Sequence, residues 1–549
     1  MLVAEAVGRA LAGHGVRTAF GVVGSGNFHA TNALVAAGVR FIAAAHEGGA
    51  ATMADAYTRT SGEPAVLSVH QGPGVTNALT GITEAAKSRT PLLVLAPEAT
   101  AARSNFYIDL AVCAEAVGAG FLRVRAESVY EDVSDAYHAA AKGLGGTVVL
   151  GLPLDVQAAR AGPPPDLGIS EPPAPEPPGP LPEQVRDLAD LLRRRSRPVF
   201  IAGRGATRSP DRARMALTEL ADRCGALLAV SAAAKGLFTG DPWYLDVSGG
   251  FASPLAADLI SRSDLVVAWG SALNMWTTRH GGLIGRDAAV VQVDVAASAL
   301  GANRPIDLGV IGDITDVADA VASELAEWRS AGWRSPELAE RIATEVRWRD
   351  VPYTDDSGVG RIDPRTLSIA LDDLLPADRT VAVDSGNFMG YPSMYLSVPD
   401  QAGFCFTQAF QSIGLGLASG IGAALARPDR LTVAALGDGG FLMSVAELAT
   451  AVRLDLPLLV VIYNDAAYGA EVHHFGPDGH PVETVTFPDT DLAAIGRGFG
   501  AAGVTVRTAA DLAGVADWLA GPRNRPLVVD AKVTSARGAW WLEEAFRGH

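Results

Sequence analysis

The chain has 549 residues, a formal net charge of −17 and an apolar content of 48%. This length predicts two to four domains, and the negative charge argues against nucleic acids and anionic membranes as partners. The three cysteines, Cys113, Cys224 and Cys405, are too scattered for disulfides or a zinc site, so a reducing, cytoplasmic location is expected.

The first 160 residues alternate helical and strand-like patterns, which predicts an α/β domain built on a parallel sheet. Apolar residues at helical spacing, with charges between them, predict a helix over 2–12 rather than a signal peptide. Further helices are predicted over 48–60 and 77–87, and strands over 17–23, 39–44, 65–69 and 91–96. No apolar run in the chain is long enough to span a bilayer.

A proline-rich segment separates this region from a second α/β unit. Residues 161–182 hold ten of the 33 prolines, which predicts a polyproline-like linker without a packed core. The second unit is expected over 183–330, with strands at 198–202, 264–269 and 288–293. After its first strand, Gly203-Arg204-Gly205 lacks the rest of a dinucleotide fingerprint. A charged, Trp-bearing connector over 331–363 is expected to lie on the surface.

The last region, 364–549, contains the most informative stretch of the sequence. An apolar run over 431–436 stops at Gly437-Asp438-Gly439-Gly440, a helical pattern follows over 441–454, and a second apolar run over 458–463 stops at Asn464-Asp465. Strand, helix and strand form a βαβ unit, whose crossover makes the two strands parallel. Asp438 and Asp465 are therefore expected at the same carboxyl edge of one sheet, where open α/β folds bind ligands.

Two acidic side chains at such an edge can bind Mg²⁺, which prefers a few carboxylates together with phosphate oxygens. The neighbouring glycines allow backbone N–H groups to approach an anion closely. The pattern therefore predicts a metal ion that bridges the chain to a diphosphate. The alternative is an ordinary glycine-rich turn before a helix.

The GDG sequence followed by Asn464-Asp465 resembles the thiamine diphosphate signature. Acetolactate synthases, pyruvate oxidases, pyruvate decarboxylases and benzoylformate decarboxylases share it. In the other half of the chain, AAHEGGAATMADAYTR and HQGPGVTNALTGITEAAKSRTPLLVLAPE resemble the pyrimidine-binding domain of these enzymes. QSIGLGLASGIGAALARPDR resembles the segment before their GDG motif.

The resemblance implies three doubly wound parallel-sheet domains. They are a pyrimidine-binding domain over 1–160, a central domain over 183–330 and a diphosphate-binding domain over 364–549. It also implies thiamine diphosphate and Mg²⁺ as cofactors, a 2-oxo acid as substrate, and a homodimer or tetramer with active sites between subunits. Some relatives bind FAD in the central domain, which the incomplete fingerprint here argues against.

The resemblance also assigns ligands. The metal would be held by the side chains of Asp438 and Asp465 and by the carbonyl of Ala467, with Asp465 standing where many relatives have Asn. Ile413 would prop the cofactor into its bent shape, and the backbone around Gln411 would face the pyrimidine. The remaining expected cofactor contacts are Gly24, Ser25, Asn77, Gly386, Asn387, Gly437, Gly439, Gly440, Asn464, Tyr468 and Gly469.

Three residues are candidates for catalysis, and each has a structural alternative. Glu47 matches the glutamate that shares a proton with the cofactor's pyrimidine, but such an acid can also complement a helix dipole. His70 matches a catalytic histidine of benzoylformate decarboxylase, or it bonds local backbone. Glu471 matches an active-site glutamate of pyruvate decarboxylases, or it is a solvated helix acid. His29, Ala470 and His474 are weaker candidates for substrate contact.

Some positions depart from the acetolactate synthases. Pro97-Glu98 replaces their Gly-Gln, and Ala470 and His474 replace their Met and Trp. The expected function is therefore a non-oxidative 2-oxo acid decarboxylase or carboligase of the acetolactate-synthase-like branch. Acetolactate synthase proper and an acyl-transferring lyase remain alternatives among enzymes. A non-catalytic or regulatory paralogue that binds nucleotide is the alternative outside them, although it would be expected to have lost Glu47 or the metal pair.

Overall fold

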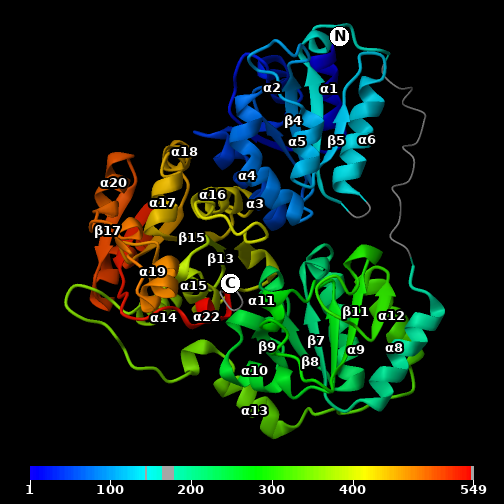
Figure 1. Cartoon of the computed structure of the whole chain (residues 1–549), viewed down its shortest axis with the longest axis vertical. Coiled ribbons are helices and arrows are strands. Elements are labelled where there is room, and N and C mark those ends of the chain that lie inside the picture. The colour runs from blue at the N-terminus through cyan, green and yellow to red at the C-terminus, as the bar shows by residue number, and fades with distance from the viewer. Residues whose placement is uncertain (143–144, 164–178, 546–549) are drawn as a thin grey trace.

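The computed structural model describes residues 1–142, 145–163 and 179–545. Within them the chain forms three six-stranded sheets, all of whose paired strands are parallel, with helices packed around each sheet (Figure 1). This confirms the predicted fold class of three α/β domains. No described helix is both long enough and apolar enough to cross a membrane.

The first sheet has the order β2-β1-β3-β4-β6-β5. Its strands are β1 (Thr18–Gly21), β2 (Arg40–Ala43), β3 (Ala65–Ser68), β4 (Leu92–Glu98), β5 (Gly120–Arg123) and β6 (Thr147–Pro153). The helices around it are α1 (Val3–Gly13), α2 (Phe28–Ala36), α3 (Glu47–Ser61), α4 (Pro73–Lys87), α5 (Leu110–Ala116), α6 (Val129–Ala141) and α7 (Leu154–Gln157). Helix α3 begins at Glu47 because the His46 imidazole accepts from the Gly48 N–H and caps it.

The third sheet repeats this order as β14-β13-β15-β16-β18-β17. Its strands are β13 (Arg379–Val383), β14 (Phe404–Phe406), β15 (Leu431–Gly437), β16 (Leu458–Asn464), β17 (Ala502–Val506) and β18 (Leu527–Lys532). Its helices are α14 (Pro364–Leu374), α15 (Gly390–Tyr395), α16 (Gly416–Ala426), α17 (Asp438–Ser444), α18 (Glu447–Arg453), α19 (Gly469–Phe475), α20 (Leu492–Gly498), α21 (Ala513–Ala520) and α22 (Trp540–Ala545). The first and third domains therefore share one topology.

The central sheet has a different order, β12-β11-β10-β7-β8-β9. Its strands are β7 (Pro198–Ala202), β8 (Leu227–Val230), β9 (Tyr244–Val247), β10 (Leu265–Trp269), β11 (Ala289–Asp294) and β12 (Leu308–Ile311). Helices α8 (Pro182–Arg194), α9 (Pro210–Cys224), α10 (Pro254–Ser261), α11 (Met275–Thr278) and α12 (Ile314–Glu324) surround it. The strand order reverses between β7 and β10, a place where open α/β sheets often bind ligands. Here, however, Gly203 and Gly205, which follow β7, pack tightly on Gly270, which follows β10. A side chain at Gly203 or Gly205 would clash with the backbone of Gly270.

Two sequence-based expectations were wrong in detail. The connector contains helix α13 (Pro336–Glu345), whose Leu338 and Ile342 pack with Val346 into the core of the central domain, so it does not simply cover the surface. The helix predicted over 441–454 is two helices, α17 and α18, with a break at 445–446. Most of the proline-rich linker, 164–178, lies outside the described residues.

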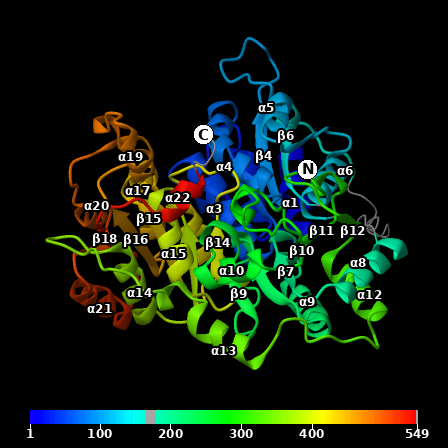
Figure 2. The same ribbon diagram turned by 60° about the horizontal axis from the view of Figure 1, so that its bottom comes forward.

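The first and third domains pack directly on each other. Helix α3 crosses α16 so closely that any side chain at Gly422 would run into the backbone of Met53. Figures 1 and 2 both place α3, in blue, at the boundary between these domains. Apolar residues of the two domains, Ala50, Ala54, Leu417 and Ile421 among them, share one hydrophobic core.

Candidate cofactor site

Asp438 and Asp465 lie where neighbouring strands end, as predicted for one βαβ unit. Strands β15 and β16 pair in register up to Gly437 and Tyr463, Asp438 begins α17, and Asp465 follows β16. Burial raises the pKa of Asp438 to about 6. Burial, followed by the charge of Asp438, raises the pKa of Asp465 to about 7. Asp438 is buried and Asp465 is partly buried. Two neighbouring carboxyl groups with raised pKa values form a site that favours a cation.

The turn after β16 is shaped by Asn464. Its Oδ1 accepts from the Ala466 N–H at 3.1 Å, and Ala466 has a left-handed φ of 61°. Its Nδ2 donates to Asp530 Oδ1 at 2.8 Å, so both polar atoms of the Asn464 amide are engaged within the protein. The Ala467 N–H donates to the Asp465 carboxylate. Asn464 thus fixes the turn that presents Asp465 and Ala467.

A buried ion pair between Lys532 and Asp530 packs beneath this turn. No sequence motif predicted this ion pair. Lys532, only 2% exposed, lies 3.0 Å from Asp530 and donates to Asp489 at 2.5 Å and to the Thr490 carbonyl at 2.7 Å. Asp530, which also bonds Asn464, accepts from the Leu492 N–H at 2.9 Å. The carboxylate and ammonium are therefore well satisfied, and the turn rests on a rigid polar base.

The glycines of the GDGG turn permit close packing around a hollow. A side chain at Gly439 would collide with the ring of Tyr468, which itself packs on Phe487. A side chain at Gly440 would collide with the carboxylate of Asp384. The hollow measures about 260 Å³ and is lined by Asp438, Gly439, Leu442, Met443, Asn464, Tyr468, Phe487, Pro488, Thr490 and Leu492.

Asp384 is a further buried acid of this domain, and no sequence motif indicated its role. It follows β13 and accepts from the N–H groups of Ser385, Gly414 and Leu415 at 2.8–3.1 Å. Burial raises its pKa to about 6 despite these donors. The carboxyl therefore anchors the loop in which Gln411 (φ 60°) and Gly414 (φ 88°) are left-handed and which contains Ile413.

Gly386, Asn387 and Gly469 lie on the far side of the acidic pair. Gly386 has a φ of 138°, a conformation that favours glycine, and introduces Asn387. The Asn387 side chain bonds the carboxylate of Asp465, and its Oδ1 accepts from the Ala539 N–H at 3.3 Å. A side chain at Gly469 would press on Asp465 and Asn387. These residues hold Asp465 in place.

Glu47 stands at a second cluster, in the first domain. Its Oε2 accepts from Asn77 Nδ2 at 3.1 Å, and Asn77 lies in the first turns of α4. Gly74 also faces this carboxylate, because a Cβ there would lie 3.5 Å from Glu47 Oε1. The carboxyl group is half-buried and has one side-chain partner, which leaves acceptor capacity free.

His70 completes this cluster together with the Gly24 turn. Its Nε2 is 3.5 Å from Ser25 Oγ, its Nδ1 is 3.2 Å from the Gln71 carbonyl, and its ring lies 5.4 Å from that of Phe106. A side chain at Gly24 would collide with the imidazole. His29, on α2, is exposed beside the ring of Phe28.

The helix beyond the acidic pair is α19, which carries the candidates Ala470, Glu471 and His474. Ala470 packs against the core, and Glu471 and His474 are partly buried. The neighbouring His473 has a buried Nε2 that finds no hydrogen-bond partner among the described residues, and burial lowers its pKa. Helical periodicity alone cannot tell these two adjacent histidines apart.

The structure therefore brings the predicted residues together as two clusters, not one. One contains Glu47, His70 and the Gly24 turn, and the other contains Asp438 and Asp465. In the described parts of the chain, no hydrogen bond or ion pair joins Glu47 or His70 to either aspartate. Each cluster contains part of the set of site residues that the resemblance implies.

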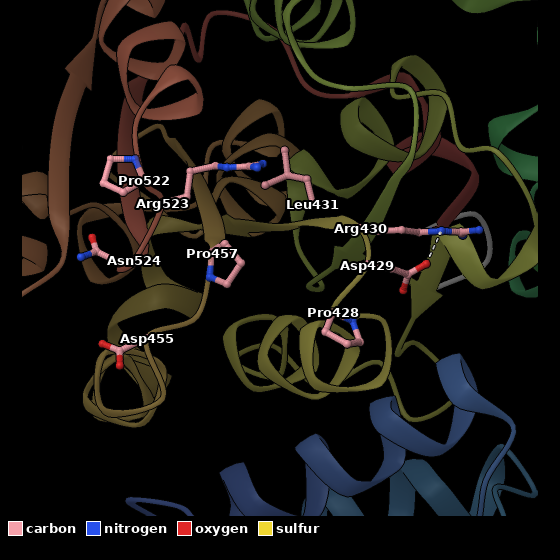
Figure 3. Close-up of a pocket in the computed structure, with 9 residues that line it drawn as sticks. All are labelled: Pro428, Asp429, Arg430, Leu431, Asp455, Pro457, Pro522, Arg523 and Asn524. Atoms are coloured by element: carbon pink, nitrogen blue, oxygen red, sulfur yellow. Dashed lines mark ion pairs between the residues drawn. The ribbon is translucent and has the colours of Figure 1, made fainter.

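A larger cavity of about 490 Å³ lies elsewhere on the third domain (Figure 3). It is bounded by the beginnings of β15, β16 and β18 through Leu431, Pro457 and Asn524, hence at the edge opposite Asp438. The Arg430 guanidinium beside it is already paired with Asp378 and Asp400, at 2.8 and 2.5 Å. The acidic edge, with its unneutralised carboxyl pair, remains the candidate cofactor site.

Comparison with known proteins decides which family the site belongs to. Residues 1–119 match the thiamine pyrophosphate enzyme N-terminal TPP binding domain, 185–321 its central domain and 384–531 its C-terminal TPP binding domain. The chain belongs to the thiamine pyrophosphate enzyme family. Thiamine pyrophosphate is another name for thiamine diphosphate, so this cofactor is the one that the two TPP binding domains indicate.

Curated relatives of this thiamine diphosphate enzyme carry out several reactions. The chain is 29% identical to a sulfoacetaldehyde acetyltransferase of Rhodobacter capsulatus, over 93% of this chain and 90% of the relative. It is also 29% identical to a probable 2-ketoarginine decarboxylase of Pseudomonas aeruginosa, over 91% of this chain and 88% of that relative. An acetolactate synthase large subunit of Parasynechococcus marenigrum is again 29% identical, over 92% of this chain and 83% of that relative. The reaction class is therefore not fixed by similarity.

A solved structure shows the same fold. The thiamine diphosphate-dependent 4-hydroxybenzoylformate decarboxylase of Rhodococcus jostii RHA1 superposes with a TM-score of 0.80 at 22% identity, covering 97% of this chain and 99% of that one.

The residues at the acidic edge fit a diphosphate held through a metal. Among the described residues no group of three or more His, Cys, Asp or Glu side chains could hold a metal ion. The Asp438–Asp465 pair therefore needs further oxygen ligands, which a backbone carbonyl and a diphosphate provide. Gly439 lines the hollow, and helix α17 begins at Asp438, so the first N–H groups of this helix lack partners within the helix and can bind an anion.

Proposed function

We propose that this protein is a Mg²⁺-dependent, non-oxidative thiamine diphosphate enzyme that decarboxylates a 2-oxo acid. The remaining fragment is then protonated or joined to an acceptor carbonyl. The observation that carries this proposal is the pair of carboxyl groups, Asp438 and Asp465, whose pKa values are raised, beside the glycine turn that begins helix α17. Such a pair gains most from a divalent cation that a diphosphate also ligates.

In this proposal the third domain binds and orients. Asp438, Asp465 and the Ala467 carbonyl hold Mg²⁺, and the Gly437–Gly440 turn offers backbone N–H groups to the diphosphate. Ile413 and Gln411 lie on the loop that Asp384 anchors, beside that turn. When bound, thiamine diphosphate supplies an acidic C2 position and accepts the electrons left by decarboxylation.

The first domain moves protons. Glu47 holds the proton that it shares with the pyrimidine N1′, and the Asn77 amide orients its carboxyl group. His70, braced by Ser25 and the Gln71 carbonyl, is placed to exchange a proton with the substrate. Glu471, on α19 just beyond the metal turn, takes the same role from the other side.

The two clusters meet if two chains associate. Phe106 and Tyr107 are exposed beside the first cluster, and Leu442 and Met443 are exposed beside the second, so each half-site has apolar surface to bury. We therefore propose a homodimer, or a dimer of dimers, in which the first domain of one subunit faces the third domain of its partner. The active site is complete only between subunits.

The donor in this proposal is a small 2-oxo acid, and the relatives leave two outcomes for the acyl fragment. The similarity to a probable 2-ketoarginine decarboxylase favours release as an aldehyde. The similarity to an acetolactate synthase large subunit favours joining of the fragment to an acceptor carbonyl, which is the second candidate function.

Calorimetry with thiamine diphosphate tests the proposal. Wild-type protein is expected to bind the cofactor with Mg²⁺ and to lose most affinity in EDTA. Asp438→Ala is expected to abolish binding, because the diphosphate charge then lacks metal ligands. Asp429→Ala, which changes an aspartate at the opposite edge, is the matched control and should bind normally. Undiminished affinity in Asp438→Ala would refute the assignment.

A donor panel then separates the two outcomes. Loaded wild-type protein is incubated with pyruvate, benzoylformate and 2-ketoarginine, with and without an acceptor aldehyde. Release of CO₂ and an aldehyde without any acceptor supports the decarboxylase, whereas formation of a hydroxy-ketone that requires the acceptor aldehyde supports the carboligase. Absence of CO₂ from every 2-oxo acid would contradict both.

A further inference from the structure

Glu447 of the third domain holds the segment that ends at Glu47. This residue begins α18 and is 2% exposed. Its carboxylate accepts from the backbone N–H groups of Ala45 and His46 at 3.1 and 2.9 Å. Arg453, at the end of the same helix, donates to the Ala43 carbonyl. The backbone immediately before Glu47 is therefore held by side chains from the other domain.

Glu84 makes the reciprocal contact, from the first domain to the third. It lies on α4 and is 1% exposed. Its carboxylate accepts from the N–H groups of Ala409 and Phe410 at 3.0 and 2.6 Å. Arg59 pairs with Glu84 at 2.7 Å and donates to the Phe406 carbonyl at 2.9 Å. The backbone immediately before Gln411 is thus held in the same way.

The charge state of Glu84 agrees with this role. Burial alone would raise its pKa, but the charge of Arg59 and the N–H groups of Phe410 and Ala409 hold the pKa below its usual range. An ionised carboxylate is the strongest acceptor for two successive N–H groups. A hydroxyl supports each acid as well, Ser88 for Glu84 and Thr450 for Glu447.

The two devices occupy equivalent places in the shared topology. Glu84 lies on the helix after the third strand of the first sheet, and Glu447 lies on the helices after the third strand of the other. Each carboxylate binds the segment that connects the second strand of the opposite domain to the next helix. For Glu447 this segment runs from β2 to α3, and for Glu84 it runs from β14 to α16. Neither acid takes part in the proton transfers or the metal binding proposed above.

We infer that Glu447 and Glu84 are positioning residues, which fix the backbone of Glu47 and of the Gln411–Ile413 loop across the domain boundary. The effect on catalysis rests on the proposed function, whereas the contacts do not. Since α17 starts at Asp438 and α18 at Glu447, one continuous stretch of chain connects the metal turn to the Glu47 segment. In the proposed dimer these belong to different active sites.

Amide hydrogen exchange of the cofactor-free chain tests the positioning directly. Glu447→Gln keeps one acceptor but loses the other, so exchange of the Ala45 and His46 amides should become roughly tenfold to a hundredfold faster. Exchange at Ala409 and Phe410 should not change. Glu84→Gln should give the reverse pattern.

The matched control is Asp264→Asn in the central domain. Asp264 accepts from the successive N–H groups of Ser196 and Arg197 at 2.9 and 2.8 Å, so it is the same device away from both clusters. This variant should accelerate exchange only near 196–197. Unchanged exchange at 45–46 in Glu447→Gln, or equal acceleration of all three segments in every variant, would overturn the inference.

A second measurement separates positioning from simple attachment of the domains. In loaded protein, Glu447→Gln should slow exchange of the cofactor C2 proton roughly tenfold to a hundredfold without weakening cofactor affinity, because Glu47 is displaced. Glu84→Gln should weaken cofactor affinity instead. Wild-type C2 exchange in Glu447→Gln would overturn the role assigned to it. If wild-type protein binds no thiamine diphosphate, the proposed function fails while the backbone result stands.

Discussion

The first and third domains have the same strand order but opposite electrostatics where their third and fourth strands end. In the third domain these positions carry Asp438 and Asp465, and the charge of Asp438 contributes to the raised pKa of Asp465. In the first domain they carry His70 and Glu98, and Glu98 is neutralised by Arg123 through two 2.7 Å hydrogen bonds. One edge therefore favours an external cation and the other has its own. Identical topology thus hosts different chemistry, which resides in a few edge residues.

The largest expected effect tests what the first domain contributes. Glu47→Gln should still bind thiamine diphosphate and Mg²⁺, because the third domain is unchanged. Exchange of the C2 proton should slow by about 10²–10⁴-fold, the usual cost of losing an acid–base group. NMR of the bound cofactor measures this rate. Wild-type exchange would return Glu47 to the role of a helix-terminal acid.

Next come the two groups proposed to exchange protons with the substrate. His70→Ala and Glu471→Gln should each lower turnover by roughly 10²-fold while cofactor affinity and C2 exchange stay nearly intact. Steady-state kinetics on the donor identified in the panel, beside calorimetry, provide the readouts. Full turnover in both variants would make them bystanders and would favour an acceptor-driven carboligase.

The third prediction concerns Arg123, the cation that pairs with Glu98 in the first domain. Arg123→Met should destabilise the protein by about 2 kcal/mol, since it leaves the buried Glu98 carboxylate without its charged donors. The double variant with Glu98→Gln should recover part of this loss. Chemical denaturation measures both. A double variant less stable than either single one would show that charge pairing is not what matters here.

The smallest effect concerns the acidic pair of the metal-free protein. The pKa of Asp465 is raised from 3.8 to about 7 by burial and by Asp438, so the folded state binds the proton more tightly than the unfolded chain. This carboxyl group's contribution to stability is therefore greatest below about pH 4 and is lost as the pH rises through 7.

Replacing Asp465 by a neutral amide should remove the loss of stability at high pH. In EDTA, Asp465→Asn is expected to be more stable than wild type at pH 8 by about 1 kcal/mol, with a smaller difference at pH 5. Thermal unfolding at the two pH values checks this. An equal difference at both would mean that the titration of Asp465 is not responsible.

Local patterns predicted much of this molecule because strands and glycine turns are local features. The strand 198–202 was placed without error, and Asp438 and Asp465 lie at adjacent strand ends. Sequence patterns failed where the role of a residue depends on a partner that is distant in the sequence. Nothing near Glu447 in the sequence reveals that it accepts from His46, some 400 residues away.

The same reasoning explains the errors. No glycine or proline marks the break between α17 and α18, so periodicity suggested one helix. The apolar residues Leu338 and Ile342 looked like part of a charged connector until the central sheet supplied a surface for them. Asp384 and Lys532 gain their roles only from the elements that close over them.

The crossing of α3 with α16 has a consequence for how the chain is made. Much of α3, from Ala50 to Thr58, is buried, and part of its cover is a helix that is synthesised after the whole central domain. At roughly 5–20 residues per second, the delay on the ribosome is on the order of tens of seconds. During that time the newly made first domain exposes an apolar helix face, which is a natural substrate for a holdase chaperone.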